Sequence, residues 1–447
     1  MASHSGIRGI YGESITPDLV IKLTKAFVSL WKVNSVVVGR DTRPSGEAME
    51  HAVLSALADL GCKTYVVGIQ PTPVILWTCK SIRADGAIII SASHNPPEWN
   101  ALKFALKGML LDVDEVSKLM TYAGEGRYLA VGGRRAITLS FDPLEEYMRE
   151  AIKFLDVEAI KRREPIVVID PGGGAGSIAT PLLLRKLGCK VITINSAPGL
   201  FSREVEPSPS ALSSLSKAVK AHEADVGFAH DADADRLVCV ADGGEVLAED
   251  YGLAIASIHV LSNRKGPLVV SVASSMVFKW IAEKMGVNIY WSPVGEARVV
   301  RTILEHQAPI GGEGSSGGII PAFFNLARDG VFGAALIVEA LTLSESRLSE
   351  YIKRLPKYYQ AKEAVNCHPS KYEVVMKNLI SEFYGEELDL TDGIKLWLRD
   401  GWILIRPSQT EPKIRILCEA TSKDSVQVLL RKYLNIVKGV VERVERY

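Results

Sequence analysis

Short apolar runs alternate with longer helical segments over most of the chain, and glycines mark the turns after the helices. The pattern occurs in three copies, whose first apolar runs are residues 36–39, 166–169 and 268–271. Apolar runs with helices between them predict parallel sheets built from right-handed crossovers. Because ligands bind beyond the carboxyl ends of the strands in such sheets, we expect each copy to contribute one polar loop to a shared site.

The C-terminal part of the chain follows a different pattern. Residues 402–405 and 414–417 predict two strands joined by a turn, with helical segments on either side. A chain of 447 residues also exceeds the length that a single hydrophobic core supports. We therefore predict an α/β protein in which three related α/β domains with mixed, largely parallel sheets and a C-terminal α+β domain surround a central cleft. The expected domains are residues 1–150, 151–250, 251–365 and 366–447.

Charge and composition exclude several classes of function. The 52 basic residues balance 52 acidic ones, so the chain has no overall field that would attract nucleic acid or an anionic membrane. The first residues lack the pattern of a targeting segment, and Glu339 interrupts the longest apolar stretch, 331–343. We expect a cytoplasmic protein without a membrane anchor or a nucleic-acid partner. Six scattered cysteines form no C-x-x-C pair and are expected to be buried free thiols.

The first candidate loop, residues 91–97, follows a buried strand and contains Ser93. Two prolines prevent an immediate helix, so the serine is presented at a strand end. A hydroxyl in this position can carry a phosphoryl group if positive charge nearby neutralises the transferring oxygens. An Asn-Pro turn with capping serines is the alternative, and this loop alone does not decide between them.

The second loop places Asp231, Asp233 and Asp235 at alternate positions. An extended or looping backbone can direct all three carboxylates at one point, where Mg²⁺ would relieve their repulsion. A calcium EF-hand starts similarly, but this loop has Arg236 and Asp242 where an EF-hand requires Gly and Glu. A solvated acidic turn is the remaining alternative.

Two further loops offer groups that suit a sugar phosphate. Glu313 and Ser315 on a glycine-rich loop could hydrogen-bond neighbouring sugar hydroxyls, although a flexible linker is the alternative. Residues 406–412, with Arg415 beyond them, combine guanidinium groups, hydroxyls and turn amides that could hold a phosphate dianion. A polar hairpin turn would explain the same residues.

Two other motifs suggest a structural role. Residues 39–43, Gly-Arg-Asp-Thr-Arg, either orient the Ser93 loop or form a salt-bridged strand end, and we favour the second interpretation. The glycine-rich residues 172–177 lack the spacing and the ending of a nucleotide-binding loop, which favours a tight turn from strand to helix.

The four loops, in this order, resemble those of the α-D-phosphohexomutase superfamily, which includes phosphoglucomutases, phosphomannomutases and phosphoglucosamine mutases. The resemblance covers essentially the whole chain and begins with Ser-Gly-Ile-Arg-Gly at residues 5–9. It implies that the four domains contribute, in turn, the phosphoserine, the metal, the sugar and the phosphate loops. It also implies Mg²⁺ and a hexose 1,6-bisphosphate as intermediate and activator.

The resemblance assigns roles to individual residues. In this family the phosphoserine is the fourth Mg²⁺ ligand, a lysine in the position of Lys103 is a candidate proton shuttle, and an arginine like Arg8 approaches the transferred phosphate. We expect Arg236 to stabilise the transferring group, while His94 either contacts phosphate or caps its loop. The residues that match the phosphoserine, metal, sugar and phosphate motifs are Ser93, Asp231, Asp233, Asp235, Glu313, Ser315, Arg406, Ser408 and Thr410.

The chain departs from the family pattern at three places. Gly317 and Gly318 stand where many bacterial relatives have Gly-His, so no histidine is present there for proton transfer or substrate choice. Gln409 stands where Gly is common in the phosphate loop, and Ala101 where Gly is common before the lysine. None of these changes removes a group that phosphoryl transfer needs.

The expected function is therefore interconversion of hexose 1-phosphate and hexose 6-phosphate through a phosphorylated Ser93. A metal-dependent phosphatase that uses the same serine is the alternative enzyme, and a sugar-phosphate sensor is the non-catalytic one. A hydrolase needs no second site for the non-reacting phosphate, which favours the mutase. Whether glucose, mannose or glucosamine phosphate is the substrate, and whether the protein is a monomer or a homo-oligomer, stays open.

Overall fold

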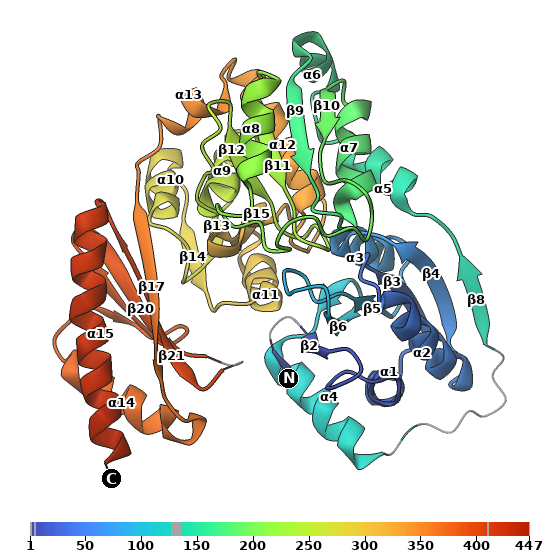
Figure 1. Cartoon of the computed structure of the whole chain (residues 1–447), viewed down its shortest axis with the longest axis horizontal. Coiled ribbons are helices and arrows are strands. Elements are labelled where there is room, and N and C mark those ends of the chain that lie inside the picture. Colours follow the sequence, from blue (N-terminus) through green and yellow to red (C-terminus); the bar gives the residue numbers. More distant parts are fainter. Residues whose placement is uncertain (1, 4–5, 127, 129–135, 409–410, 447) are drawn as a thin grey trace.

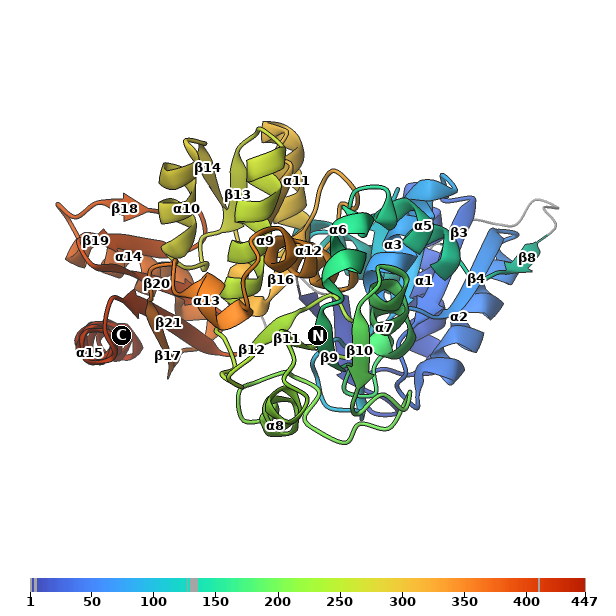
Figure 2. The ribbon, with the colours of Figure 1, turned by 90° about the horizontal axis from the view of Figure 1, so that it is seen from above.

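The computed structural model describes residues 2–3, 6–126, 128, 136–408 and 411–446. Four sheets follow one another along the chain, each with its own helices (Figure 1). The first and the C-terminal sheets lie at opposite ends of the molecule in both views (Figures 1 and 2). This architecture confirms the predicted α/β class with a distinct C-terminal domain.

The first sheet has the order β1-β2-β6-β5-β3-β4-β8, and β7 pairs with β6. Helices α1, α2 and α4 cover one face, where Val36 and Val38 of β3 point, while α3 covers the face of Val37. Thr16 caps the start of α1, and Asp112 and Glu115 form a capping box at α4. The elements are β1 (Ala2–Ser3), β2 (Gly6–Ile10), α1 (Pro17–Trp31), β3 (Ser35–Arg40), α2 (Gly46–Asp59), β4 (Lys63–Ile69), α3 (Thr72–Ser81), β5 (Gly86–Ile90), β6 (Trp99–Leu106), β7 (Met109–Leu110), α4 (Val113–Glu125) and β8 (Ile137–Ser140).

The second and third sheets have the orders β10-β9-β11-β12 and β14-β13-β15-β16. In both, three parallel strands end in one antiparallel strand. The second group is α5 (Leu144–Ile152), α6 (Val157–Arg163), β9 (Ile166–Asp170), α7 (Gly176–Lys186), β10 (Lys190–Thr193), α8 (Ser213–Ala221), β11 (Val226–Ala229) and β12 (Val238–Ala241). The third is α9 (Asp250–Asn263), β13 (Leu268–Ser271), α10 (Val277–Met285), β14 (Ile289–Ser292), α11 (Glu296–His306), β15 (Ile310–Glu313), η1 (Gly314–Ser316), β16 (Gly318–Ile320), α12 (Gly330–Leu343) and α13 (Leu348–Ile352).

The strands β4-β3-β5-β6 of the first sheet repeat this arrangement, with β4, β3 and β5 parallel and β6 antiparallel. The three predicted polar loops therefore occupy equivalent places. Each leads from the last parallel strand into the antiparallel one, between β5 and β6, β11 and β12, and β15 and β16. The predicted threefold relationship thus extends to the site.

The long apolar stretch of the sequence forms α12, which is buried along almost its whole length. It contacts α6, α7 and α9, so the second and third domains share one hydrophobic core. Among the residues that the structure describes, no helix is long and apolar enough to cross a membrane.

The C-terminal sheet is antiparallel, in the order β17-β21-β20-β19-β18, and α15 packs on β17 and β21. Because β17 pairs with β21 and begins at Tyr359, we propose to place the third domain boundary ahead of this strand instead of at residue 365, and to keep those near 150 and 250. The elements are β17 (Tyr359–Asn366), η2 (Pro369–Lys371), α14 (Tyr372–Glu382), β18 (Leu388–Asp389), β19 (Ile394–Leu398), β20 (Gly401–Pro407), β21 (Lys413–Ala420) and α15 (Lys423–Glu445).

Trp402 is the largest fully buried side chain and joins the third and fourth domains. Its ring packs with Val272 and Ala273, and its indole Nε1 donates to Glu419 at 3.0 Å. The buried Lys395 lies over the same ring and donates to the Val272 carbonyl at 2.6 Å. This contact attaches the C-terminal sheet to the third domain.

We expect Trp402→Ala to lower the free energy of unfolding by about 3–5 kcal/mol, because the change leaves a cavity in a buried interface and removes one of the two hydrogen bonds to Glu419 Oε1. Denaturant unfolding followed by circular dichroism measures the loss. Tyr384→Ala is the matched control, since that ring is 94% exposed, and should change stability by less than about 0.5 kcal/mol. Equal effects of the two changes would contradict the assignment.

Candidate active site

Ser93 lies just beyond β5 and is fully buried. Its φ of 54° is in the left-handed region, which a serine adopts only when its surroundings impose it. The Ser93 amide donates to the Ser91 hydroxyl at 3.0 Å, and the Ser93 hydroxyl donates to Asp231 Oδ2 at 2.5 Å. The strained backbone therefore directs the hydroxyl at the first aspartate of the metal loop.

Arg43 holds the Ser93 loop in this conformation. Its buried guanidinium donates to the carbonyls of Ser93 and Asn95, both at 2.7 Å, and to those of Pro96 and Trp99. Asp41 accepts from Arg43 and, at 2.6 Å, from the Ser91 hydroxyl. The expectation that residues 39–43 only form a salt-bridged strand end is wrong, because the ion pair also binds the loop backbone.

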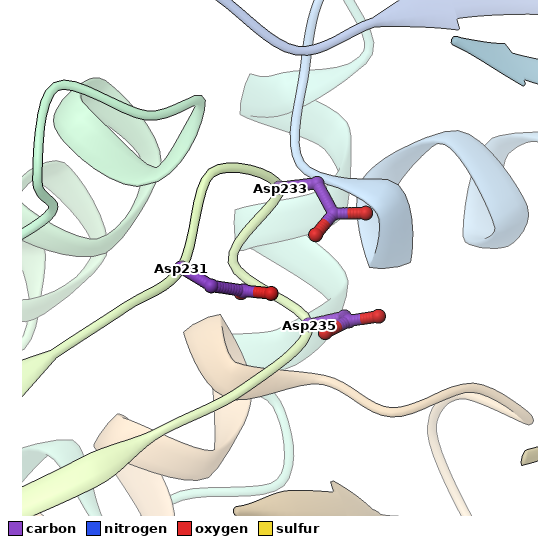
Figure 3. Close-up of side chains that lie close together, drawn as sticks. All are labelled: Asp231, Asp233 and Asp235. Atoms are coloured by element: carbon purple, nitrogen blue, oxygen red, sulfur yellow. The ribbon is translucent and has the colours of Figure 1, made fainter. Parts of the chain in front are cut away.

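The loop between β11 and β12 brings Asp231, Asp233 and Asp235 together, with one oxygen of each within 4.8 Å of the others. All three side chains are buried and gather on one side of the loop (Figure 3). Asp233 Oδ1 and Asp235 Oδ1 have no hydrogen-bond partner among the described residues. Two buried oxygens without donors, beside a third carboxylate, fit a divalent cation that prefers hard oxygen ligands.

The surroundings of Asp231 and Asp233 shift the pKa values of these two carboxyl groups in opposite directions. Burial, followed by the neighbouring Asp235 and Asp233, raises the pKa of Asp231 to about 8. Burial opposes ionisation of Asp233 as well, but Lys103 holds the pKa of that carboxyl below its usual range. A bound cation would remove the repulsion that makes one of these groups hold its proton.

Lys103, predicted as the proton shuttle, lies on β6 with its amine in this carboxylate cluster. The buried Nζ is 2.5 Å from Asp233 Oδ2 and 3.5 Å from Asp235 Oδ2. Thr72 donates to the same Asp233 oxygen at 2.6 Å. The structure therefore brings the lysine from the first domain into contact with the loop of the second.

Arg8, Arg236 and His94 form further contacts at the Ser93 loop. Arg8 donates to the Asn95 side chain at 2.7 Å, and Arg236 donates to His94 Nδ1 at 2.8 Å. Burial and the guanidinium groups of Arg236 and Arg8 lower the pKa of His94 to about 2. His94 is thus neutral, and its contacts are with the Ser93 hydroxyl, at 3.4 Å, and with Arg236.

Glu313 ends β15 and is held through both carboxylate oxygens. Oε1 accepts from the Gly295 amide at 2.7 Å, and Oε2 accepts from Arg328 at 3.3 Å. Arg328 also donates to Asp235, so the sugar loop is joined to the metal loop. Ser315 follows Glu313 in η1 and is partly exposed. Sequence reasoning missed Arg328, because it belongs to none of the four motifs.

The phosphate loop connects β20 to β21. Arg406 pairs with Asp392 at 3.1 Å, and the same Asp392 oxygen accepts from the Val294 amide at 3.0 Å. Since Val294 precedes the glycine that binds Glu313, Asp392 links the phosphate and sugar loops. Ser408 and Arg415 contact Glu411 of their own turn. The predicted Thr410 lies outside the described residues.

Four sequence families match consecutive parts of the chain. They are the phosphoglucomutase/phosphomannomutase α/β/α domains I, II and III, over residues 2–127, 145–244 and 248–359, and the C-terminal domain, over residues 347–433. The chain belongs to the phosphoglucomutase/phosphomannomutase family.

Individual members of the family match the chain over nearly its whole length. A phosphoglucomutase/phosphomannomutase of Thermococcus kodakarensis is 40% identical and covers 96% of both chains. A phosphoglucosamine/phosphogalactosamine mutase of Sulfurisphaera tokodaii is 31% identical, covering 97% of this chain and 98% of the relative. The crystal structure of a phosphoglucomutase/phosphomannomutase family protein of Burkholderia thailandensis superposes with a TM-score of 0.87, at 26% identity over 98% of both chains.

We predict that Arg43→Met lowers the free energy of unfolding by about 3–5 kcal/mol, because it leaves Asp41 charged and buried without its partner. Denaturant unfolding gives this value, and hydrogen exchange should show faster exchange of the amides in residues 92–95. Arg149→Met is the control, since the ion pairs of that arginine among the described residues lie on the exposed surface of α5. A loss below about 1 kcal/mol, with unchanged exchange, would show that Arg43 does not hold the loop.

Proposed function

We propose that the chain is a phosphohexomutase that interconverts hexose 1-phosphate and hexose 6-phosphate through a phosphorylated Ser93. The contact of the Ser93 hydroxyl with Asp231, inside a buried set of three carboxylates, carries the proposal. Lys103, Arg8 and Arg236 add positive charge around the same hydroxyl. Family membership favours this activity over the phosphatase and the sensor, because the relatives described above are mutases.

We assign a separate role in the reaction to each of the four loops. Phosphoserine 93 donates its phosphoryl group to the free hydroxyl of a bound monophosphate. The bond from phosphorus to Ser93 Oγ breaks, and a bond from phosphorus to the sugar oxygen forms. We propose Lys103 as the proton shuttle, whose ammonium group gives a proton to the departing Ser93 Oγ and takes one from the sugar hydroxyl. The resulting hexose 1,6-bisphosphate turns over in a cleft between the domains and returns its other phosphate to Ser93.

Asp231, Asp233, Asp235 and the phosphoserine would hold Mg²⁺, which when bound neutralises charge on the transferring phosphoryl oxygens. Nε of Arg236 lies 3.7 Å from Asp231 Oδ2, which contacts the reacting serine. Arg236 would therefore stabilise the same phosphoryl oxygens. Arg8, which fixes Asn95 of the serine loop, would approach them from β2. His94 is neutral and therefore accepts a hydrogen bond from Arg236 without competing for phosphate charge.

The third and fourth domains provide the residues that would bind the sugar and the phosphate that is not being transferred. We propose that Glu313 and Ser315 bind sugar hydroxyls, and that Arg406, Ser408, Thr410 and Arg415 bind the phosphate that is not reacting. Glucose, mannose and glucosamine phosphates are the candidate substrates. We also place the enzyme in the cytoplasm, because a charged sugar phosphate does not cross a lipid bilayer unaided.

Incubation with glucose 1-phosphate, Mg²⁺ and catalytic glucose 1,6-bisphosphate tests the proposal. We expect glucose 6-phosphate to form, while Ser93→Ala and wild type in excess EDTA give no turnover, because they lack the covalent carrier and the cation. Ser117→Ala, a change on the exposed surface of α4, should leave the rate unchanged. Release of inorganic phosphate would indicate the phosphatase, and a wild type inactive with glucose, mannose and glucosamine phosphates alike would indicate the sensor.

Arg406→Ala should lower kcat/KM about ten- to a hundredfold for the 1-phosphate and the 6-phosphate alike, since one loop holds whichever phosphate is idle. A charge-assisted contact contributes roughly 1.5–3 kcal/mol, which corresponds to a loss of this size. Free hexose 1,6-bisphosphate should also accumulate during turnover, because its anchor is weakened. Arg399→Ala, on the exposed turn before β20, is the control. Impairment with only one monophosphate would show that Arg406 is not the shared anchor.

A further inference from the structure

Arg328 lies between β16 and α12, at the place where the metal loop and the sugar loop meet. We propose that Arg328 is a positioning residue. It fixes the relative positions of Glu313, the proposed sugar-binding residue, and Asp235, a proposed metal ligand. The inference rests on the proposed function of these two loops. It adds a residue that lies outside the four motifs.

One part of Arg328 is fixed by Glu296, the first residue of α11. The Arg328 amide donates to Glu296 Oε1 at 2.9 Å, and Nε donates to Oε2 at 3.1 Å. Both residues are buried, with exposed fractions of 5% and 4%. A carboxylate held by the amide and the side chain of the same residue sets the plane of the guanidinium before any ligand arrives.

The two terminal nitrogens then bind one loop each. Nη2 donates to Asp235 Oδ2, and Nη1 donates to Glu313 Oε2 at 3.3 Å and to the Ser316 hydroxyl at 3.4 Å. Asp235 keeps Oδ1 without a hydrogen-bond partner among the described residues, so one oxygen is left for the metal. The planar guanidinium thus holds Asp235 and Glu313 at a set separation and orientation.

Gly318 provides the space for this arrangement. A Cβ atom at Gly318 would lie 2.4 Å from Cδ of Arg328, closer than side chains approach one another. The stem of Arg328 therefore occupies the volume that a side chain at this position would need. The close approach of the Arg328 stem therefore favours glycine at residue 318.

Lysine cannot replace arginine here. It keeps one positive charge but has a single nitrogen, which cannot reach Glu296, Asp235 and Glu313 together in a planar fork. Arg328→Lys therefore removes the geometry and retains the charge. The effect of the change on metal binding is then not attributable to a lost positive charge.

A double-mutant cycle separates positioning from a general structural role. Wild type, Arg328→Lys, Glu313→Gln and the double variant are titrated in EDTA with glucose 6-phosphate, and in parallel with mannose 6-phosphate, by calorimetry. We expect each single change to weaken binding by about tenfold, and the double variant to bind no more than about threefold worse than Glu313→Gln, because Arg328 acts through Glu313. The binding of Mn²⁺ alone, measured by electron paramagnetic resonance, should weaken at least threefold in Arg328→Lys.

Independent effects, with a loss of about a hundredfold in the double variant, or an unchanged Mn²⁺ affinity in Arg328→Lys, would overturn the proposal. A wild type that binds neither sugar phosphate would instead contradict the proposed function. Arg163→Lys is the control for removal of a structural arginine, since Arg163 donates to carbonyls at the end of α12 and should leave both affinities unchanged.

Gly318→Ala tests the same contact without altering a charge, in case Arg328→Lys folds poorly. The added methyl group displaces the stem of Arg328, so we expect it to weaken sugar-phosphate binding and Mn²⁺ binding in the same direction. Unchanged affinities in a folded Gly318→Ala protein would also contradict the proposal.

Discussion

Three buried carboxylates on one short loop are the constraint on which the rest of the site depends. Like charges this close in a medium of low dielectric repel strongly, so the fold must supply positive charge around Asp231, Asp233 and Asp235. Lys103 comes from the first domain and Arg328 from the third. The neutralising groups therefore lie in different domains, and the site exists only when those domains are packed together.

The repeated strand order explains how the loops come to one place. In each of the first three domains the functional loop leads from the last parallel strand into the antiparallel strand. Packing of these sheets through shared elements such as α12 then brings equivalent loops close together. The different chemistry of the loops, a serine, three aspartates and a glutamate, is thus placed on one repeated backbone arrangement.

The buried arginines that fix loops differ in their contacts from the arginines that lie beside the proposed phosphate sites. Arg43 and Arg328 are buried, and their side chains donate hydrogen bonds to loop carbonyls or to carboxylates, which fixes the loops. Arg236 and Arg406 form fewer hydrogen bonds and ion pairs with the described residues, and they lie beside the proposed phosphate sites. Asp392 joins Arg406 to the Val294 amide, so the C-terminal domain is attached both there and at Trp402.

The sequence by itself determined the elements, the repeat and the residues of the motifs, because these depend on local patterns. Apolar periodicity predicted the strands, and alternate aspartates favoured a metal site. The serine at a strand end was predicted to be the nucleophile through its resemblance to the family motif. The start of the C-terminal domain was harder to predict from the sequence, because β17 is defined by its pairing with β21 and not by its own composition.

Only the tertiary structure decided which residues support the motifs. The sequence separates Arg43 from Ser93, and Arg328 from Asp235, by long stretches of chain, and an arginine bound to a carbonyl or to a distant carboxylate leaves no periodic signal. The left-handed backbone of Ser93 is likewise imposed by Arg43 and Ser91 and not by the serine itself. The need for glycine at residue 318 also depends on the tertiary structure, because the Arg328 stem that would clash with a Cβ atom there is distant from it in local sequence pattern.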